Sequence, residues 1–134
     1  MEPGSLELPS DIASVEAAAA WAEKVCMAYG LSEDEQYRLG LTVREAVANA
    51  VLHGNRRDPA RHVRLSSELR GGRLRVTVGD EGDGFDRPEA TGDVNLTSSG
   101  RGLVLIDHVT DHYDIVCRDD PPGTDVVLVF DTTT

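Results

Sequence analysis

The chain has 134 residues, which is enough for one domain with its own hydrophobic core. Its 24 Asp and Glu residues outnumber its 13 Lys and Arg residues, so the formal net charge is -11 at pH 7. Because nucleic acids and anionic membranes select basic surfaces, this charge argues against either as a direct partner. A phosphate ligand remains compatible with it, since backbone amides, helix N-termini and bound cations hold phosphates on acidic proteins.

The sequence predicts a cytoplasmic protein. Its first residues lack the basic and apolar regions of a signal peptide, and no apolar stretch approaches the ~20 residues of a membrane-spanning helix. Cys26 and Cys117 are too few for a disulfide framework in a chain of this length. We expect both to be small, mostly buried hydrophobic residues.

The chain begins with a predicted strand and helix. Residues 5–8 alternate between polar and apolar side chains, which predicts a short strand that Pro9 would end. Ser10 or Asp11 would then cap a helix over Ile12–Tyr29.

A second helix is predicted over Glu33–His53. Ser32 and Glu35 have the spacing of a capping box at its start, and Gly54 is its expected stop. Glu45, Asn49 and His53 follow one another at i, i+4 and i+8 and therefore lie in one stripe along this helix. The stripe could line a site, but from the helix alone a solvated helix rim is the favoured interpretation.

The second half of the chain is predicted to be mostly strands. Alternating residues predict strands over 63–69 and 74–78, and Gly71-Gly72 between them is a hairpin signal. The remaining predicted segments are a long loop over 86–100, a helix from about residue 101, strands over 113–118 and 125–130, and a turn over 119–124. The resulting order predicts a single α+β domain over residues 1–134, a two-layer sandwich with about three helices on a mixed, mainly antiparallel sheet.

A glycine-rich segment, 80–85, follows one of these strands directly. The strand is predicted to end at Gly79, so Asp80 would lie at a strand mouth, where an ionised carboxylate accepts hydrogen bonds. The exocyclic amine of adenine is a suitable donor. Gly82 and Gly84 would allow a tight turn and the close approach of a ligand. An ordinary acidic turn has the same composition.

A second glycine-containing segment, 98–103, leads into the predicted third helix. Backbone N–H groups and the helix dipole at such a start favour an anion, and Arg101 between Gly100 and Gly102 could add a charge-assisted phosphate contact. A flexible linker before the helix is the alternative. Near the end of that helix, His108 and His112 have a spacing that could hold a metal, but a solvated helix end is the favoured interpretation.

Four segments resemble, in chain order, the boxes of the GHKL ATPase superfamily: the N-box at 45–54, the G1 box at 80–85, the G2 box at 100–103 and the final short box at 123–124. The superfamily has the Bergerat ATP-binding fold. Within it the chain most resembles the bacterial anti-sigma factor serine/threonine kinases, and the resemblance covers about residues 5–131.

The resemblance implies ATP and magnesium as cofactors and a role for each matching residue. Glu45 would be the general base, and Asn49 would hold the magnesium ion that bridges the ATP phosphates. The implied nucleotide contacts are Asp80 at the adenine amino group, Gly82 and Gly84 around the pocket, Gly100, Arg101 and Gly102 at the phosphates, and Thr124 near the adenine.

The implied function is an anti-sigma factor that is also an ATP-dependent protein serine/threonine kinase. It would phosphorylate an antagonist (anti-anti-sigma) protein, sequester a sigma factor and form a homodimer, with residues 5–20 as the expected dimer surface. Only residues 86–99 are available for an ATP lid, so a weakly or non-catalytic ATP-binding regulatory module is the main alternative. A histidine kinase catalytic domain and an α+β domain without a nucleotide complete the alternatives.

Overall fold

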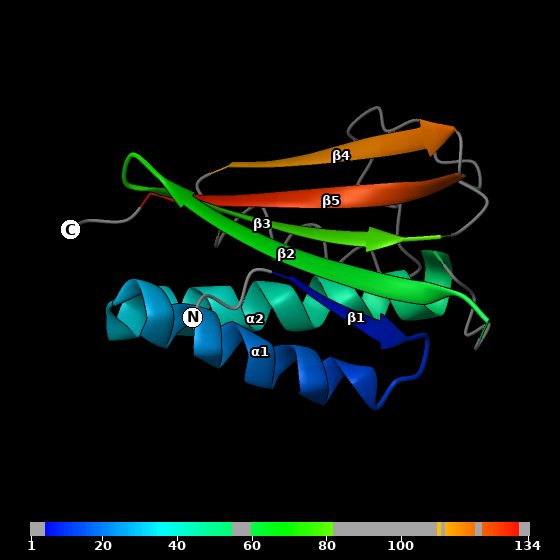
Figure 1. Cartoon of the computed structure of the whole chain (residues 1–134), viewed down its shortest axis with the longest axis horizontal. Helices are drawn as coiled ribbons and strands as arrows, with labels where there is room; N and C mark the ends of the chain where they lie inside the picture. The colour runs from blue at the N-terminus through cyan, green and yellow to red at the C-terminus, as the bar shows by residue number, and fades with distance from the viewer. Residues whose placement is uncertain (1–4, 55–59, 82–109, 111, 120–121, 132–134) are drawn as a thin grey trace.

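A computed structural model describes residues 5–54, 60–81, 110, 112–119 and 122–131, which form two layers (Figure 1). One layer is a five-stranded sheet of order β1-β2-β3-β5-β4, and helices α1 and α2 cover one of its faces. The elements are β1 (Ser5–Pro9), α1 (Ser14–Tyr29), α2 (Glu33–Asn49), a π-helical turn η1 (Ala50–Gly54), β2 (His62–Arg70), β3 (Arg73–Asp80), β4 (His112–Asp119) and β5 (Pro122–Asp131).

The two-layer α+β prediction is confirmed. All four strand pairings within the described residues are antiparallel, as expected for a mainly antiparallel sheet. The predicted third helix lies outside the described residues. Neither α1 nor α2 has the length and apolar character needed to cross a lipid bilayer.

Helix α1 begins two residues later than predicted, at Ser14. The carboxylate of Asp11 accepts a hydrogen bond from the backbone N–H of Ala13 at 2.9 Å, so it stabilises a turn before the helix. Ser10 is buried and donates to the backbone carbonyl of Arg61 at 2.9 Å, so it ties the chain to the start of β2. The N-cap position is Ala13, which has no side-chain cap hydrogen bond. The helix ends at Gly30, whose left-handed φ of 66° suits glycine.

Helix α2 begins as predicted. The Ser32 hydroxyl accepts from the backbone N–H of Glu35 at 3.1 Å, and the Glu35 carboxylate accepts from that of Ser32 at 2.8 Å. This reciprocal capping box satisfies two N–H groups that a helix start leaves without intrahelical partners. The α-helical part ends at Asn49, four residues earlier than predicted, and continues as η1 to Gly54.

The sheet follows the predicted alternation. Gly71 and Gly72 have φ values of 60° and 77°, the left-handed pair that a tight two-residue hairpin between β2 and β3 requires. The last two strands are longer than predicted, because β4 and β5 pair out to Asp119 and Pro122. Pro122 and Thr124 are therefore strand residues, whereas the sequence predicted a turn there; proline is tolerated as the first residue of a strand.

The core lies between the sheet and the two helices, and aliphatic side chains dominate it. Leu39 and Val43 of α2 share one core cluster with the even-numbered apolar residues of β3 and β5. Phe130 is the largest fully buried side chain among the described residues. Burial of these faces supplies the main driving force for folding.

Replacing Leu39 with alanine should lower the free energy of unfolding by about 2–5 kcal/mol, because Leu39 is fully buried and its loss leaves a cavity. The matched control is Leu69→Ala, which removes the same atoms from a side chain that is 37% exposed. Urea denaturation followed by circular dichroism measures both. Equal losses for the two variants would contradict this placement of the core.

Candidate functional site

The end of β3 brings together two of the predicted site residues. Asp80 is the last residue of β3 and is paired with Thr124 of β5. The carboxylate of Asp80 accepts a hydrogen bond from the backbone N–H of Thr124 at 3.2 Å, and both residues are buried. Because burying a carboxylate is costly unless it is hydrogen-bonded, this contact stabilises an acceptor on the helix-covered side of the sheet.

The same cross-strand row continues to β4. Cys117 pairs with Thr124, so the side chains of Asp80, Thr124 and Cys117 point to one face of the sheet. Cys117 is exposed, and the prediction that it is buried is wrong. Among the described strands, β4 lies at the edge of the sheet and pairs only with β5. Cys26 lies inside the helical layer and is buried as predicted.

Glu45 and Asn49 lie on the last two turns of α2, one turn apart, and both are half-buried. The η1 turn that follows contacts β3, so the end of the helical segment meets the strand that carries Asp80. Such π-helical turns are rare and often occur at functional sites.

The other predicted contacts stay predictions. Five of the predicted site residues lie outside the described part of the chain: Gly82, Gly84, Gly100, Arg101 and Gly102. The described part of the site therefore consists of the buried, hydrogen-bonded Asp80–Thr124 pair on β3 and β5 and of the polar stripe on α2.

Sequence reasoning missed Glu81, the residue after Asp80. Its carboxylate accepts a hydrogen bond from the backbone N–H of His62 at 2.9 Å and another from the guanidinium of Arg64 at 2.8 Å. Arg64 also donates to Glu7 of β1 at 3.3 Å. Neighbouring strand residues point to opposite faces, so an inward-facing Asp80 already implied an outward-facing Glu81.

The described residues give little support for a metal held by protein groups alone. His112 is the first residue of β4 and is exposed, so the prediction that it continues a helix from His108 is wrong. Glu7, His62 and Glu81 place three possible ligand atoms within 4.8 Å of one another. Arg64 donates to both of those carboxylates, so its guanidinium already supplies a positive charge to this cluster.

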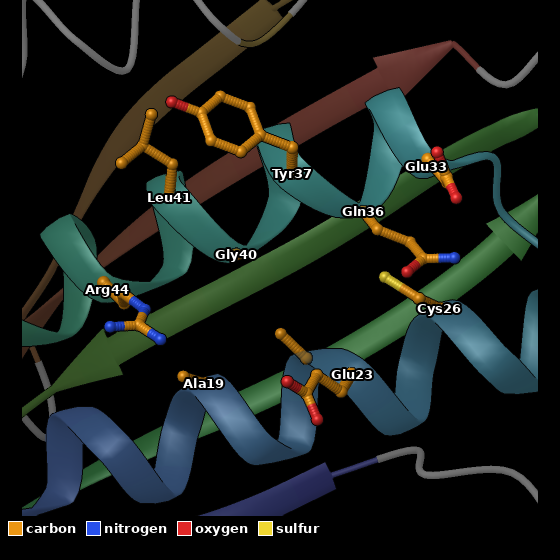
Figure 2. A pocket seen from close by; sticks show the side chains of 10 residues that line it. Ala19, Glu23, Cys26, Glu33, Gln36, Tyr37, Gly40, Leu41 and Arg44 are labelled. Carbon is orange, nitrogen blue, oxygen red and sulfur yellow. The ribbon is translucent and has the colours of Figure 1, made fainter.

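A groove of about 490 Å³ lies between α1 and α2, on the side of the helices that faces away from the sheet (Figure 2). Its floor includes Ala19, Cys26 and Gly40, and Glu23 and Arg44 stand at its rim. Neither the α2 stripe nor the Asp80–Thr124 pair lines it. The groove is therefore a separate feature from the predicted nucleotide site.

The thiol of Cys26 in this groove is chemically quiet. Burial, together with the smaller effects of the nearby carboxylates of Glu23 and Glu35, raises the pKa of Cys26 to about 11. Because the thiolate is the reactive species, the thiol stays protonated and inert at neutral pH.

Comparison with known proteins places this chain in a family. A family model described as the histidine kinase-like ATPase domain matches residues 8–130. The chain belongs to this family. The resemblance to the GHKL superfamily is thereby confirmed, and the chain is a member of a group of ATP-binding domains.

The curated relatives of this histidine kinase-like ATPase domain include anti-sigma F factors. That of Geobacillus stearothermophilus is 34% identical over 101 residues, covering 71% of this chain and 68% of the relative. That of Anoxybacillus flavithermus is 30% identical over 102 residues, covering 72% and 69%. These similarities confirm the predicted subgroup resemblance.

Solved structures share the fold at low identity. The structure of the RsbU and RsbW domains of Rv1364c from Mycobacterium tuberculosis matches 97% of this chain with a TM-score of 0.69 and 18% identity, and the match spans 33% of that chain. The SiaB-SiaC complex from Pseudomonas aeruginosa contributes a chain with a TM-score of 0.67 and 13% identity, with 94% of this chain and 89% of that one covered. These two matches show a shared α+β fold.

We expect the two cysteines to differ sharply in reactivity. At pH 8 a soluble disulfide reagent should modify Cys117 rapidly and Cys26 only after denaturation, because one thiol is exposed and the other is buried with a raised pKa. The absorbance of the thiol released by the reagent gives the number of cysteines modified. Cys117→Ser should abolish the fast phase and Cys26→Ser should leave it intact. A fast phase that survives in Cys117→Ser would show that Cys26 is accessible.

Proposed function

We propose that this chain is an anti-sigma factor that binds MgATP and phosphorylates a serine or threonine of an antagonist protein. In the same proposal the chain sequesters a sigma factor, and it acts as a cytoplasmic homodimer. Membership in the histidine kinase-like ATPase family and similarity to anti-sigma F factors support it.

The observation that carries the proposal is the buried carboxylate of Asp80 at the end of β3. A carboxylate only accepts hydrogen bonds, and the 6-amino group of adenine is a donor of matching character. The backbone of Thr124 already donates to Asp80 at 3.2 Å, so the acceptor is oriented by a neighbouring strand before a nucleotide arrives. Such preorganisation reduces the cost of binding.

Asn49 and Glu45 supply the groups that phosphoryl transfer needs. The side-chain carbonyl of Asn49 fits a magnesium ion, which prefers oxygen ligands and takes most of its others from phosphates and water. When bound, that ion neutralises charge on the phosphates. Glu45 lies one turn earlier on α2, where its carboxylate can accept the proton of the attacking hydroxyl.

In the proposed reaction the hydroxyl oxygen of the antagonist forms a bond to the γ-phosphorus as the bond to the β-phosphate oxygen breaks. ADP leaves, and the hydroxyl proton passes to Glu45. The backbone around Gly100–Gly102 and the guanidinium of Arg101 are proposed to hold the phosphates, with Gly82 and Gly84 shaping the pocket. Each of these roles uses a residue type suited to an anion or to a close backbone approach.

A non-catalytic or weakly catalytic ATP-binding module is the second candidate. The segment available for an ATP lid, 86–99, is short, and lids exclude water and complete phosphate contacts. In that case nucleotide binding alone would control docking of a partner protein. Retention of Glu45 favours the kinase.

Nucleotide binding is tested by titrating MgATP into the wild type, Asn49→Ala and Asp80→Ala. We expect Asp80→Ala to weaken ATP binding about tenfold or more, because a hydrogen bond to a charged acceptor is lost. Asn49→Ala should weaken binding in the presence of magnesium and change it little without magnesium. Isothermal titration calorimetry measures both. Identical binding by all three proteins would refute the site.

Phosphoryl transfer is tested separately, with labelled ATP and candidate antagonist proteins. Glu45→Ala should reduce labelling of the antagonist at least a hundredfold, the usual contribution of a general base, while ATP binding stays close to that of the wild type. The matched control is Tyr37→Ala, which changes an exposed side chain elsewhere on α2. Arg38→Ala is unsuitable, because Arg38 packs over the ring of Phe130. Binding of ATP without labelling of any partner would favour the module.

A further inference from the structure

Where the backbone pairing between β2 and β3 ends, the side chain of Glu81 makes the next hydrogen bond between the two segments. Its register runs from Arg70 opposite Arg73 to Arg64 opposite Gly79. Two further steps along this register place Glu81 opposite His62. Glu81 is already outside β3, and its carboxylate accepts the backbone N–H of His62 at 2.9 Å. The side chain thus continues the hydrogen bonding of the sheet where the strand ends.

The second oxygen of Glu81 is held as well. It accepts from Arg64 at 2.8 Å, and Arg64 donates to Glu7 of β1 at 3.3 Å. The side chain of Glu81 is only 25% exposed, whereas those of Arg64 and Glu7 are about half exposed. The hydrogen bond to His62 joins the Glu81 side chain to the backbone of β2, so it anchors the residue that follows β3.

Asp80 and Glu81 are therefore held from opposite sides of the sheet. Thr124 donates to Asp80 on the helix-covered face, and His62 donates to Glu81 near the other face. Anchoring two consecutive residues in this way leaves little freedom for the peptide between them. The direction of the Asp80 side chain is fixed accordingly, and hydrogen bonds weaken steeply when their geometry is poor.

We infer that Glu81 is a positioning residue for base recognition: its bond to His62 holds Asp80 in the orientation that accepts the amino group of the purine. This inference rests on the proposed binding of ATP at Asp80. Glu81 itself touches no ligand and acts through its neighbour. Its effect falls on discrimination between bases and leaves affinity for the rest of the nucleotide unchanged.

The test compares the dissociation constant of ATP with that of the purine riboside triphosphate that lacks the 6-amino group. The wild type should prefer ATP about tenfold or more, and Asp80→Ala should lose that preference. Glu81→Ala should reduce the preference roughly three- to tenfold, the net value of one hydrogen bond. Its affinity for the analogue should stay within about twofold of the wild type, as suits a residue that acts on base recognition alone.

Two further variants separate positioning from general damage. Glu81→Gln keeps an oxygen that can accept the N–H of His62, so it should restore most of the preference for ATP. Glu68→Ala removes another outward-facing glutamate of the sheet, one paired with Arg70 at 2.8 Å. It should leave the dissociation constants of both ligands unchanged. Thermal melting of each variant confirms that it is folded.

Three results would overturn the inference. Glu81→Ala could keep the full preference for ATP while Asp80→Ala loses it, or it could weaken both ligands equally. Glu81→Gln could also lose as much preference as Glu81→Ala. A wild type that binds both ligands alike, with no change in Asp80→Ala, would instead refute the proposed nucleotide site, and the inference with it.

Discussion

The antiparallel pairing of β3 with β5 is the constraint on which the candidate site depends. It places Asp80 opposite Thr124, two residues that are 44 positions apart in the chain. The pairing is stabilised by the even-numbered apolar residues of both strands, which pack against the helices. A buried carboxylate at the end of this ladder is stable because a backbone N–H already donates to it. Folding of the core and formation of the acceptor are therefore one event.

The helical layer contributes the other half of the site by a different principle. The capping box fixes where α2 begins, and its apolar face fixes how α2 is rotated against the sheet. Together they determine the direction of Glu45 and Asn49, which are themselves only half-buried. After Asn49 the helix continues as the π-helical turn η1, which contacts β3. The polar stripe thus depends on distant contacts for its orientation.

The sequence predicted what local patterns determine. Alternation, capping residues and paired glycines located both helices and the hairpin within a few residues, because those signals act between near neighbours. It could not predict the exposure of Cys117, since that follows from the edge position of β4 in a strand order set by the whole sheet. Nor could spacing alone distinguish an α-helical from a π-helical end at residues 50–54. The contacts of Glu81 required the register of β2 against β3.

The capped start of α2 also limits how the length of this helix can vary. Each residue added to an α-helix rotates everything beyond it by about 100° and advances it by about 1.5 Å. One residue inserted between Ser32 and Glu45 would rotate the stripe relative to the sheet, or else push the apolar face out of the core. Exposed positions of α2 can therefore accept many substitutions, but this stretch should keep a constant length among proteins that use the same site.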